Sequence, residues 1–314
     1  LGVNTITGAV VGDESYFDEI RWVESWPERF RAGAQNQAGP LSALSVNDGF
    51  MNWDAENTAN SLNTPAVEPA QFAAALFDDL LEERSVRIFQ SAYAETKPVD
   101  AVIQLGVIES PTISEIVKQM LQTSDNTTAE ILVKAISADS GVAGSTSSGN
   151  QIIQQVVETL TGMTDSTVVA DGSGLDPSNR TTCSVLVDLL EMESFSADLY
   201  DGLAVAGESG TLRNRLTGSS AEGRLLAKTG TLNDSKSLAG VVHTLEGRTL
   251  IFALILMLGA FSRLVKIIKR KSKQITFKQG SSNRRFLSLN HRHRFLSQNQ
   301  LVHKLQPLLK KVIK

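Results

Sequence analysis

Apolar residues recur at the three- and four-residue spacing of an amphipathic helix in five segments of the chain. The first segment begins at Pro69, a favoured first helical position. In the last segment, the hydroxyl of Thr181 or Thr182 can accept a backbone N–H of the first turn. The predicted helices cover residues 69–84 (with Phe72, Leu76, Phe77, Leu80 and Leu81 on one face), 112–121, 127–136, 150–160 and about 182–192.

The pattern changes to strands after Asp201. Strands are predicted over 224–228, 237–244 and 249–256, and the short connection 245–248 makes the last two an antiparallel hairpin. Residues 1–64 alternate short apolar runs with Gly, Asn, Asp and Pro, which predicts short strands and turns. Helices grouped before antiparallel strands favour an α+β fold with an antiparallel sheet over a parallel doubly wound sheet.

Charge is divided unevenly along the 314 residues, whose net charge is −4. Residues 1–258 hold all 34 Asp and Glu but only 15 of the 30 Lys and Arg, so they carry −19, whereas residues 259–314 carry +15. One interpretation makes this basic tail an anchor for an anionic polymer or surface. The other, which we favour, is a foreign or frame-shifted extension, because the tail shows no recognised nucleic-acid motif and no nucleic acid partner is expected.

Cysteine content and hydropathy exclude some classes of protein. With Cys183 alone, the chain can form neither an internal disulfide nor a Cys-based metal site. The uncharged apolar run 249–262 is 14 residues long, shorter than the roughly 18 to 20 that a membrane-spanning helix needs. A membrane anchor over 249–268 is a weaker alternative, because Arg263 and Lys266 interrupt it.

Two tripeptides carry candidate chemistry: Ser124–Asn126 (Ser-Asp-Asn) between two predicted helices, and Lys228–Gly230 (Lys-Thr-Gly) at the end of a predicted strand. Taken singly, each is an ordinary capping turn or strand end. In this order and context, they match two of the three motifs of the serine acyl-transferases that include penicillin-binding proteins and class A β-lactamases.

Acyl transfer needs a hydroxyl nucleophile, a base, and positive charge and N–H donors near the developing negative charge. Ser124 offers a proton relay, and Asn126 can hydrogen-bond a substrate amide. Lys228 would attract a substrate carboxylate.

The residues after Lys228 would complete this half of the site. The Thr229 hydroxyl would assist the lysine, Gly230 allows close backbone approach, and the Thr231 N–H on a strand edge is a candidate oxyanion donor.

Four further segments extend the likeness to known proteins: 12–17 (Gly-Asp-Glu-Ser-Tyr-Phe), 42–48 (Ser-Ala-Leu-Ser-Val-Asn-Asp), 171–175 (Asp-Gly-Ser-Gly-Leu) and 207–215 (Gly-Glu-Ser-Gly-Thr-Leu-Arg-Asn-Arg). With the two tripeptides, the chain resembles the D-alanyl-D-alanine carboxypeptidase/endopeptidase family of penicillin-binding protein 4 type, peptidase family S13. The resemblance runs from about residue 1 to about residue 256.

This resemblance implies a secreted or periplasmic cell-envelope enzyme that cleaves the D-Ala-D-Ala bond or a crosslink of peptidoglycan stem peptides, is acylated by β-lactams and uses no cofactor. It implies the penicillin-binding protein/β-lactamase-like fold, an antiparallel sheet flanked by helices, with domains inserted after the first motif. Residues 1–64 would then end an inserted domain, 65–258 would form the partial catalytic domain, and 259–314 would be a tail foreign to the family.

The chain departs from the family at its first motif. No Ser-x-x-Lys occurs in the sequence, and Ser114 to Lys118 has one residue too many. We therefore expect the nucleophile to lie upstream of Leu1, the fold to be incomplete at both ends, and the chain as given to be inactive. The alternative is a non-catalytic envelope protein that binds peptidoglycan or an anionic polymer through residues 259–314.

Overall fold

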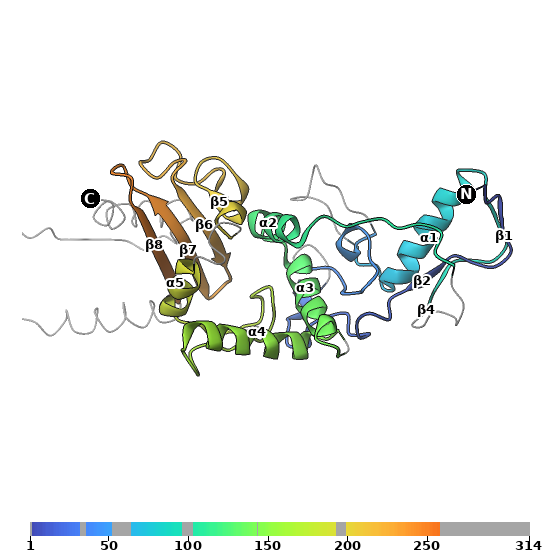
Figure 1. The fold of residues 1–314 in the computed structure, drawn as a ribbon, viewed down its shortest axis with the longest axis horizontal. Helices are drawn as coiled ribbons and strands as arrows, with labels where there is room; N and C mark the ends of the chain where they lie inside the picture. The colour runs from blue at the N-terminus through green and yellow to red at the C-terminus, as the bar shows by residue number, and fades with distance from the viewer. Residues whose placement is uncertain are drawn as a thin grey trace, which may run out of the picture. The chain divides into compact units, whose positions relative to one another are not determined.

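The computed structural model describes residues 2–31, 36–51, 64–95, 103–142, 144–192 and 199–257 (Figure 1). The chain divides into two compact units at Ala204/Val205. Each unit is considered separately below. The basic tail, on which the anionic-polymer prediction depends, lies outside the described residues.

Short parallel strands begin the first unit. β1 (Thr5–Ile6) pairs with β3 (Arg87–Ile88), and β2 (Val11–Asp13) pairs with β4 (Tyr93–Glu95). Residues from before and after position 64 therefore share these sheets. The predicted domain boundary at 64 stays a prediction, but packing does not separate the chain at that position.

Helix α1 (Pro69–Glu82) packs against β2 and β4 through its small residues. Its buried residues are Pro69, Ala70, Ala73 and Ala74, whereas Phe77 and Leu80 on the predicted apolar face are 55% and 46% exposed. Phe72, Leu76 and Leu81 of that face are part-buried, so the predicted face was wrong for Phe77 and Leu80. The reason is close backbone approach: a Cβ on Gly12 of β2 would collide with the Ala70 carbonyl oxygen, so only small side chains fit between the two elements.

The other four predicted helices are confirmed, with shifted ends: α2 (Ile113–Thr123), α3 (Asn126–Asp139), α4 (Thr146–Thr161) and α5 (Cys183–Glu191). Each begins after a capping side chain that accepts a backbone N–H, and Thr182 is the cap of α5. Helix α3 lies tightly on α4, since a Cβ at Gly149 would collide with the Val133 carbonyl oxygen.

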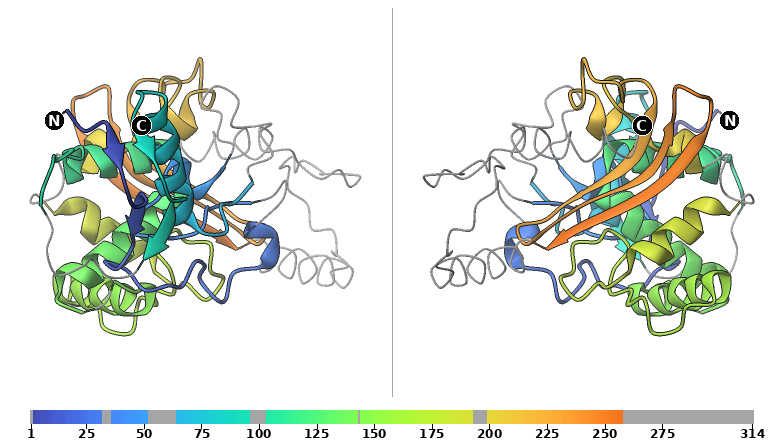
Figure 2. Two further views of the ribbon diagram at one scale, coloured as in Figure 1. Left: turned by 90° about the vertical axis from the view of Figure 1, so that its right-hand side faces the viewer. Right: turned by 90° about the vertical axis from the view of Figure 1, so that its left-hand side faces the viewer.

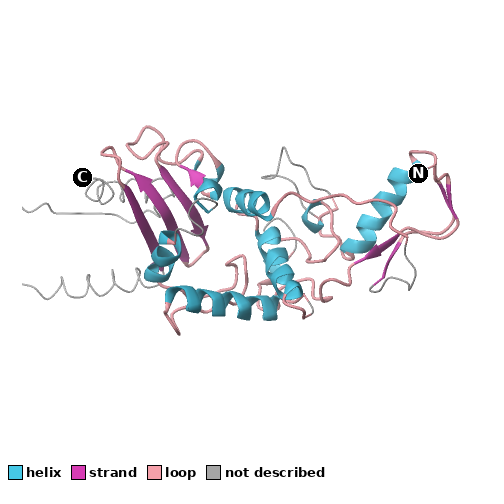
Figure 3. Ribbon diagram, in the orientation of Figure 1, coloured by secondary structure: helices cyan, strands magenta, loops and turns pink. Residues whose placement is uncertain are grey.

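The second unit is built on a four-stranded sheet of order β5-β6-β7-β8 (Figures 2 and 3). Its strands are β5 (Ala204–Val205, at the boundary), β6 (Leu225–Thr231), β7 (Ser235–His243) and β8 (Thr249–Met257), and the β6–β7 and β7–β8 pairs are antiparallel. The predicted hairpin and the α+β class are confirmed. However, β6 is longer than predicted, so Lys228–Gly230 lies within the strand and not at its end.

Among the described residues, no helix combines the length and apolar character that a bilayer crossing requires. Residues 249–257 are a sheet strand, which accounts for the start of the apolar run that gave rise to the membrane-anchor alternative.

Candidate active site

Ser124 lies in the turn between α2 and α3, where its backbone is left-handed (φ 61°, ψ 48°). Such angles are uncommon for a residue with a side chain and occur often at functional sites. Asp125 follows as the cap of α3, and its carboxylate accepts the Thr128 N–H at 3.0 Å and the Thr128 hydroxyl at 2.8 Å. The middle residue of the Ser-Asp-Asn motif is thus structural, and it holds its two neighbours at the start of the helix.

The side chain of Asn126 is held by a distant loop of the first unit. Its Nδ2 donates to the Gln37 carbonyl oxygen at 2.8 Å, and the neighbouring Thr127 Oγ1 accepts the Gly39 N–H at 2.9 Å. A carbonyl can only accept, so the Asn126 amide must turn its nitrogen toward Gln37. The hydrogen bond to Gln37 therefore fixes which side of the amide carries the Asn126 Oδ1 acceptor.

Three polar side chains one turn apart on α3 each hold a different segment. Asn126 binds residue 37, and Glu130 accepts the N–H groups of Gly172 and Ser173 at 3.0 and 2.8 Å. Lys134 forms an ion pair with Asp18 and donates to the Ile20 carbonyl oxygen at 2.8 Å. Glu130 and Lys134 are fully buried. This row connects the predicted catalytic turn with the Asp171–Leu175 segment.

Asp171 is the hydrogen-bond centre of that segment. Its carboxylate accepts from the Trp26 indole at 2.8 Å, from the Gly174 and Asp176 N–H groups at 2.7 and 2.6 Å, and from Asn179 Nδ2 at 2.7 Å. The Asp-Gly-Ser-Gly-Leu segment is therefore a turn organised by its own buried aspartate, while Gly172 and Gly174 are exposed. Gly172 is required by packing, because its Cβ would collide with Val133 of α3.

Two carboxyl groups near α3 have raised pKa values. Burial, with the Asp171 charge adding to it, raises the pKa of Glu130 to about 7. Burial and the Asp125 charge raise the pKa of Asp48 to about 6. Burial lowers the pKa of Lys134, although its Asp18 partner opposes the shift. The neighbourhood of α3 therefore contains carboxyl groups that titrate near neutrality.

In the second unit, β6 carries the Lys-Thr-Gly motif opposite 237–239 of β7. Lys228 Nζ donates to the Thr229 carbonyl oxygen at 3.0 Å, and burial lowers the pKa of the Lys228 amine. The Thr229 hydroxyl donates to Thr211 Oγ1 at 2.9 Å. A Cβ on Gly230 would meet only the Ser237 hydroxyl, which would have to rotate away, so the glycine leaves space for that hydroxyl across the strand pair.

The hydrogen-bond alternation of β6 sets the direction of the Thr231 N–H. The Leu232 N–H donates to Ser235 O at 2.9 Å and the His243 N–H to Arg224 O at 3.0 Å, so even-numbered residues of β6 exchange hydrogen bonds with β7. The N–H groups of Thr229 and Thr231 therefore point away from β7. An N–H that donates to a substrate oxyanion must not be used in pairing with β7, so this direction of the Thr231 N–H is compatible with the predicted role.

The candidate site residues are divided between the two units: Ser124 and Asn126 belong to the first, and Lys228, Thr229, Gly230 and Thr231 to the second. Their joint roles stay predictions. The residues that support them, such as Glu130, Lys134 and Thr211, were missed. Glu130 and Lys134 follow Asn126 at four-residue spacing, and charged residues on the buried side of a helix were the available signal. Among the described residues, no three His, Cys, Asp or Glu side chains gather as a metal site.

Comparison with known proteins supports the likeness seen in the motifs. The D-Ala-D-Ala carboxypeptidase 3 (S13) family model matches residues 54–268, which extends beyond the predicted boundary at 258. A D-alanyl-D-alanine carboxypeptidase of Actinomadura sp. (strain R39) is 29% identical over 78% of this chain and 59% of its own length. The carboxypeptidase DacB of Mycolicibacterium smegmatis is 32% identical over 48% of this chain and 35% of its own.

Solved structures show the same fold. Penicillin-binding protein 4 from Haemophilus influenzae matches with a TM-score of 0.72 at 17% identity, covering all of this chain and 76% of that one. The chain spans 59% or less of the length of the curated relatives it matches. From the family match over more than half of its residues, this chain belongs to the D-Ala-D-Ala carboxypeptidase 3 (S13) family.

Proposed function

We propose that the chain is part of a serine-type D-Ala-D-Ala carboxypeptidase or endopeptidase that acts on peptidoglycan stem peptides through an acyl-enzyme and is acylated by β-lactams. The supporting observation is that the Ser-Asp-Asn and Lys-Thr-Gly motifs lie inside the family match, each held by specific contacts. A related protein, penicillin-binding protein 4 of Haemophilus influenzae, has been solved in complex with a β-lactam.

Each site residue has a role in this proposal that its contacts favour. Ser124 relays the proton released by the attacking hydroxyl, and the Asn126 amide aligns the substrate's own amide. Lys228 attracts the substrate carboxylate with help from the Thr229 hydroxyl. The Thr231 N–H, directed away from β7, stabilises the oxyanion, while Gly230 lets the substrate backbone approach the strand.

The nucleophile itself is absent from these residues, because no Ser-x-x-Lys occurs in the sequence. We therefore expect this chain to form no covalent penicillin adduct. Intact-protein mass spectrometry with a labelled penicillin, on this chain beside a form extended upstream through any Ser-x-x-Lys, tests this. An adduct on the extended form alone is expected; a stoichiometric adduct on the shorter chain would overturn the inactivity.

Kinetics on an active extended form separate the two motifs. Ser124→Ala should slow acylation by about 10²-fold or more without weakening initial capture, since a proton relay acts in the transition state. Lys228→Ala should mainly weaken capture of substrate or β-lactam. Lys118→Ala, at an exposed position on α2, is the control. Unchanged kinetics in both motif variants would refute the assigned roles.

In this proposal the enzyme acts in the cell envelope, where peptidoglycan is exposed to it, and the family match supports this location. The alternative is a non-catalytic envelope protein that contacts an anionic polymer through residues 259–314. The charge of +15 in that segment favours it. No adduct on either form, with both shown to be folded, would favour this alternative.

A further inference from the structure

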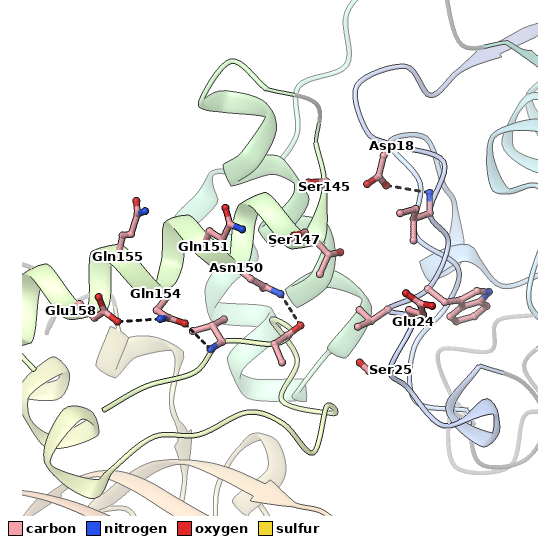
Figure 4. Close-up of a pocket in the computed structure, with 16 residues that line it drawn as sticks. Asp18, Glu24, Ser25, Ser145, Ser147, Asn150, Gln151, Gln154, Gln155 and Glu158 are labelled. Carbon is pink, nitrogen blue, oxygen red and sulfur yellow. Dashed lines mark hydrogen bonds between the residues drawn. The ribbon is translucent and has the colours of Figure 1, made fainter. Parts of the chain in front are cut away.

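A groove of about 940 Å³ lies in the first unit, between α4 and the segment 18–25 (Figure 4). The acyl-transfer roles above use none of its residues. Amide and hydroxyl side chains dominate the face that α4 contributes, and residues 169–170 form part of the floor. Its size and the polar side chains that α4 contributes suit a ligand that combines apolar surface with many hydrogen-bonding groups.

The polar side chains of α4 form two neighbouring rows. One row holds Ser147, Gln151 and Gln155, and the other holds Asn150, Gln154 and Glu158, each residue four positions after the last (Figure 4). Four residues advance a helix by about 6 Å, so similar donors and acceptors repeat along the groove. A repeating ligand matches such a ladder better than a single compact molecule does.

Unused hydrogen-bonding capacity lies at the base of this groove. Asn150 is 6% exposed, and its Nδ2 donates to the Ala170 carbonyl oxygen at 2.7 Å (Figure 4). Its Oδ1 is buried without a partner among the described residues, as is the Thr146 hydroxyl beside it. An unsatisfied buried acceptor is costly, so a ligand N–H or O–H that reached Asn150 would be bound favourably.

Charge in the groove excludes one class of ligand. Asp18, Glu24 and Glu158 line it, and no Lys, Arg or His does so among the described residues. Asp18 is paired with Lys134, and Glu158 accepts from Gln154 Nε2 at 3.1 Å, so these two carboxylates also take part in hydrogen bonding. An anionic ligand would be repelled, whereas hydroxyl groups, which donate and accept, suit every polar group present.

We propose that this groove binds an uncharged oligosaccharide of N-acetylated hexosamines. The repeating amide rows match its repeating hydroxyls, an acetamido N–H supplies the donor that Asn150 Oδ1 lacks, and Trp22 in the lining offers an aromatic surface to a sugar ring. That such a saccharide belongs to peptidoglycan glycan strands rests on the proposed function; the ligand class rests on the groove alone.

Calorimetric titration of the full chain with β-1,4-linked N-acetylglucosamine oligomers tests the proposal. Binding should strengthen from trimer to hexamer, and the double variant Gln151→Ala/Gln155→Ala should bind the hexamer at least about tenfold more weakly, as loss of one or two hydrogen bonds predicts. Both glutamines are exposed, so the variant should fold. Gln119→Ala, exposed on α2 outside the groove, should bind like the parent chain.

Maltohexaose, which lacks acetamido groups, should bind at least about tenfold more weakly than the N-acetylglucosamine hexamer. The proposal is overturned if the folded chain binds no oligomer, if the double variant and Gln119→Ala bind equally well, or if a lysine-bearing peptide is bound in preference to the sugar. Because no penicillin is used, these failures are distinguishable from a failure of the acyl-transfer proposal.

Discussion

Glu130 shows how one buried side chain can connect distant parts of a site. It lies one turn after Asn126 on α3, accepts two backbone N–H groups of the Asp171–Leu175 turn, and leaves its Oε2 without a partner in the described structure. The two hydrogen bonds favour the carboxylate, but burial and the Asp171 charge outweigh them. The turn is therefore held by a carboxyl group that gains its proton near pH 7.

We predict that Glu130→Gln flattens the pH dependence of stability. The pKa of Glu130 is about 7 in the folded protein against an ordinary 4.5, so the folded state binds more protons than the unfolded state between these values. The free energy of unfolding therefore falls as pH rises through that window, by about 3 kcal/mol from this group. The neutral amide that replaces the carboxyl group cannot ionise, so this decline should vanish.

Urea unfolding at half-unit pH steps from 4 to 8 measures this effect. Glu19→Gln, at an exposed position, is the matched control and should keep the slope of the parent chain. An identical slope in E130Q and the parent chain would show that Glu130 does not titrate in this window.

Arg21 gives a second prediction at the residue scale. Its guanidinium forms a bidentate pair with Glu14, both N–O distances being 2.7 Å, and the Ser42 hydroxyl also donates to Glu14 at 2.7 Å. Burial raises the pKa of Glu14, but the hydrogen bonds from Arg21 and Ser42 outweigh it, and the pKa is lowered. Arg21→Ala would leave Glu14 largely buried without its cation.

We expect Arg21→Ala to lower the free energy of unfolding by about 3 kcal/mol at pH 7, as for other broken buried pairs. Because the folded pKa of Glu14 is depressed, the stabilisation by this pair is present above the ordinary pKa of a glutamate and is lost as pH falls through the folded value. Chemical unfolding at pH 7 and pH 3 checks both statements; a loss of the same size at both values contradicts the ionic explanation.

At the scale of elements, α3 and the loop 36–50 form the support of the Ser-Asp-Asn turn. Gly39 donates its N–H to Thr127, and its Cα lies so close to the Asp48 carbonyl oxygen that a Cβ would collide with it. Asp48 itself has a left-handed backbone (φ 54°). This loop therefore determines how Asn126 is presented.

Gly39→Ala is predicted to destabilise the first unit by about 1–3 kcal/mol, because backbone atoms and not a flexible side chain would have to move. Gly8→Ala is the control, since a Cβ there meets open space and the residue has no left-handed backbone. Thermal unfolding followed by circular dichroism compares the two. Equal unfolding midpoints for both variants would show that the loop accommodates the extra Cβ without loss of stability.

At the scale of the whole molecule, acidic and basic residues are divided sharply between two parts of the chain. Residues 1–258 carry −19 and residues 259–314 carry +15. If the alternative function holds, the full chain should bind linear polyphosphate at low salt. The affinity should fall as the salt concentration rises, because salt screens the attraction between exposed charges. A chain ending at residue 258 should not bind it.

Electrophoretic mobility shifts at increasing salt measure this binding. Equal binding by the full and shortened chains would exclude the tail as the contact. Binding that does not weaken with salt would exclude a charge mechanism altogether.

Local patterns in the sequence were sufficient for most elements of this protein. The positions of the five helices, a threonine cap at 181 or 182 and the antiparallel hairpin depend on nearby residues and were predicted correctly, with Thr182 as the cap. The family resemblance rested on short motifs, and the family match over residues 54–268 confirmed it. The end of β6 was placed too early, since Gly230 is a weak strand former that cross-strand pairing holds extended.

Only the tertiary structure decided what each element faces. The pairing of residues 5–13 with 87–95, the alanine face by which α1 packs, and the row of Asn126, Glu130 and Lys134 all depend on partners far away in the chain. The pKa of Glu130 is raised because burial removes water from its carboxyl group, a condition that exists after folding and not in the sequence. The sequence by itself determined the elements and the family; the three-dimensional contacts determined which surfaces are buried and which groups titrate.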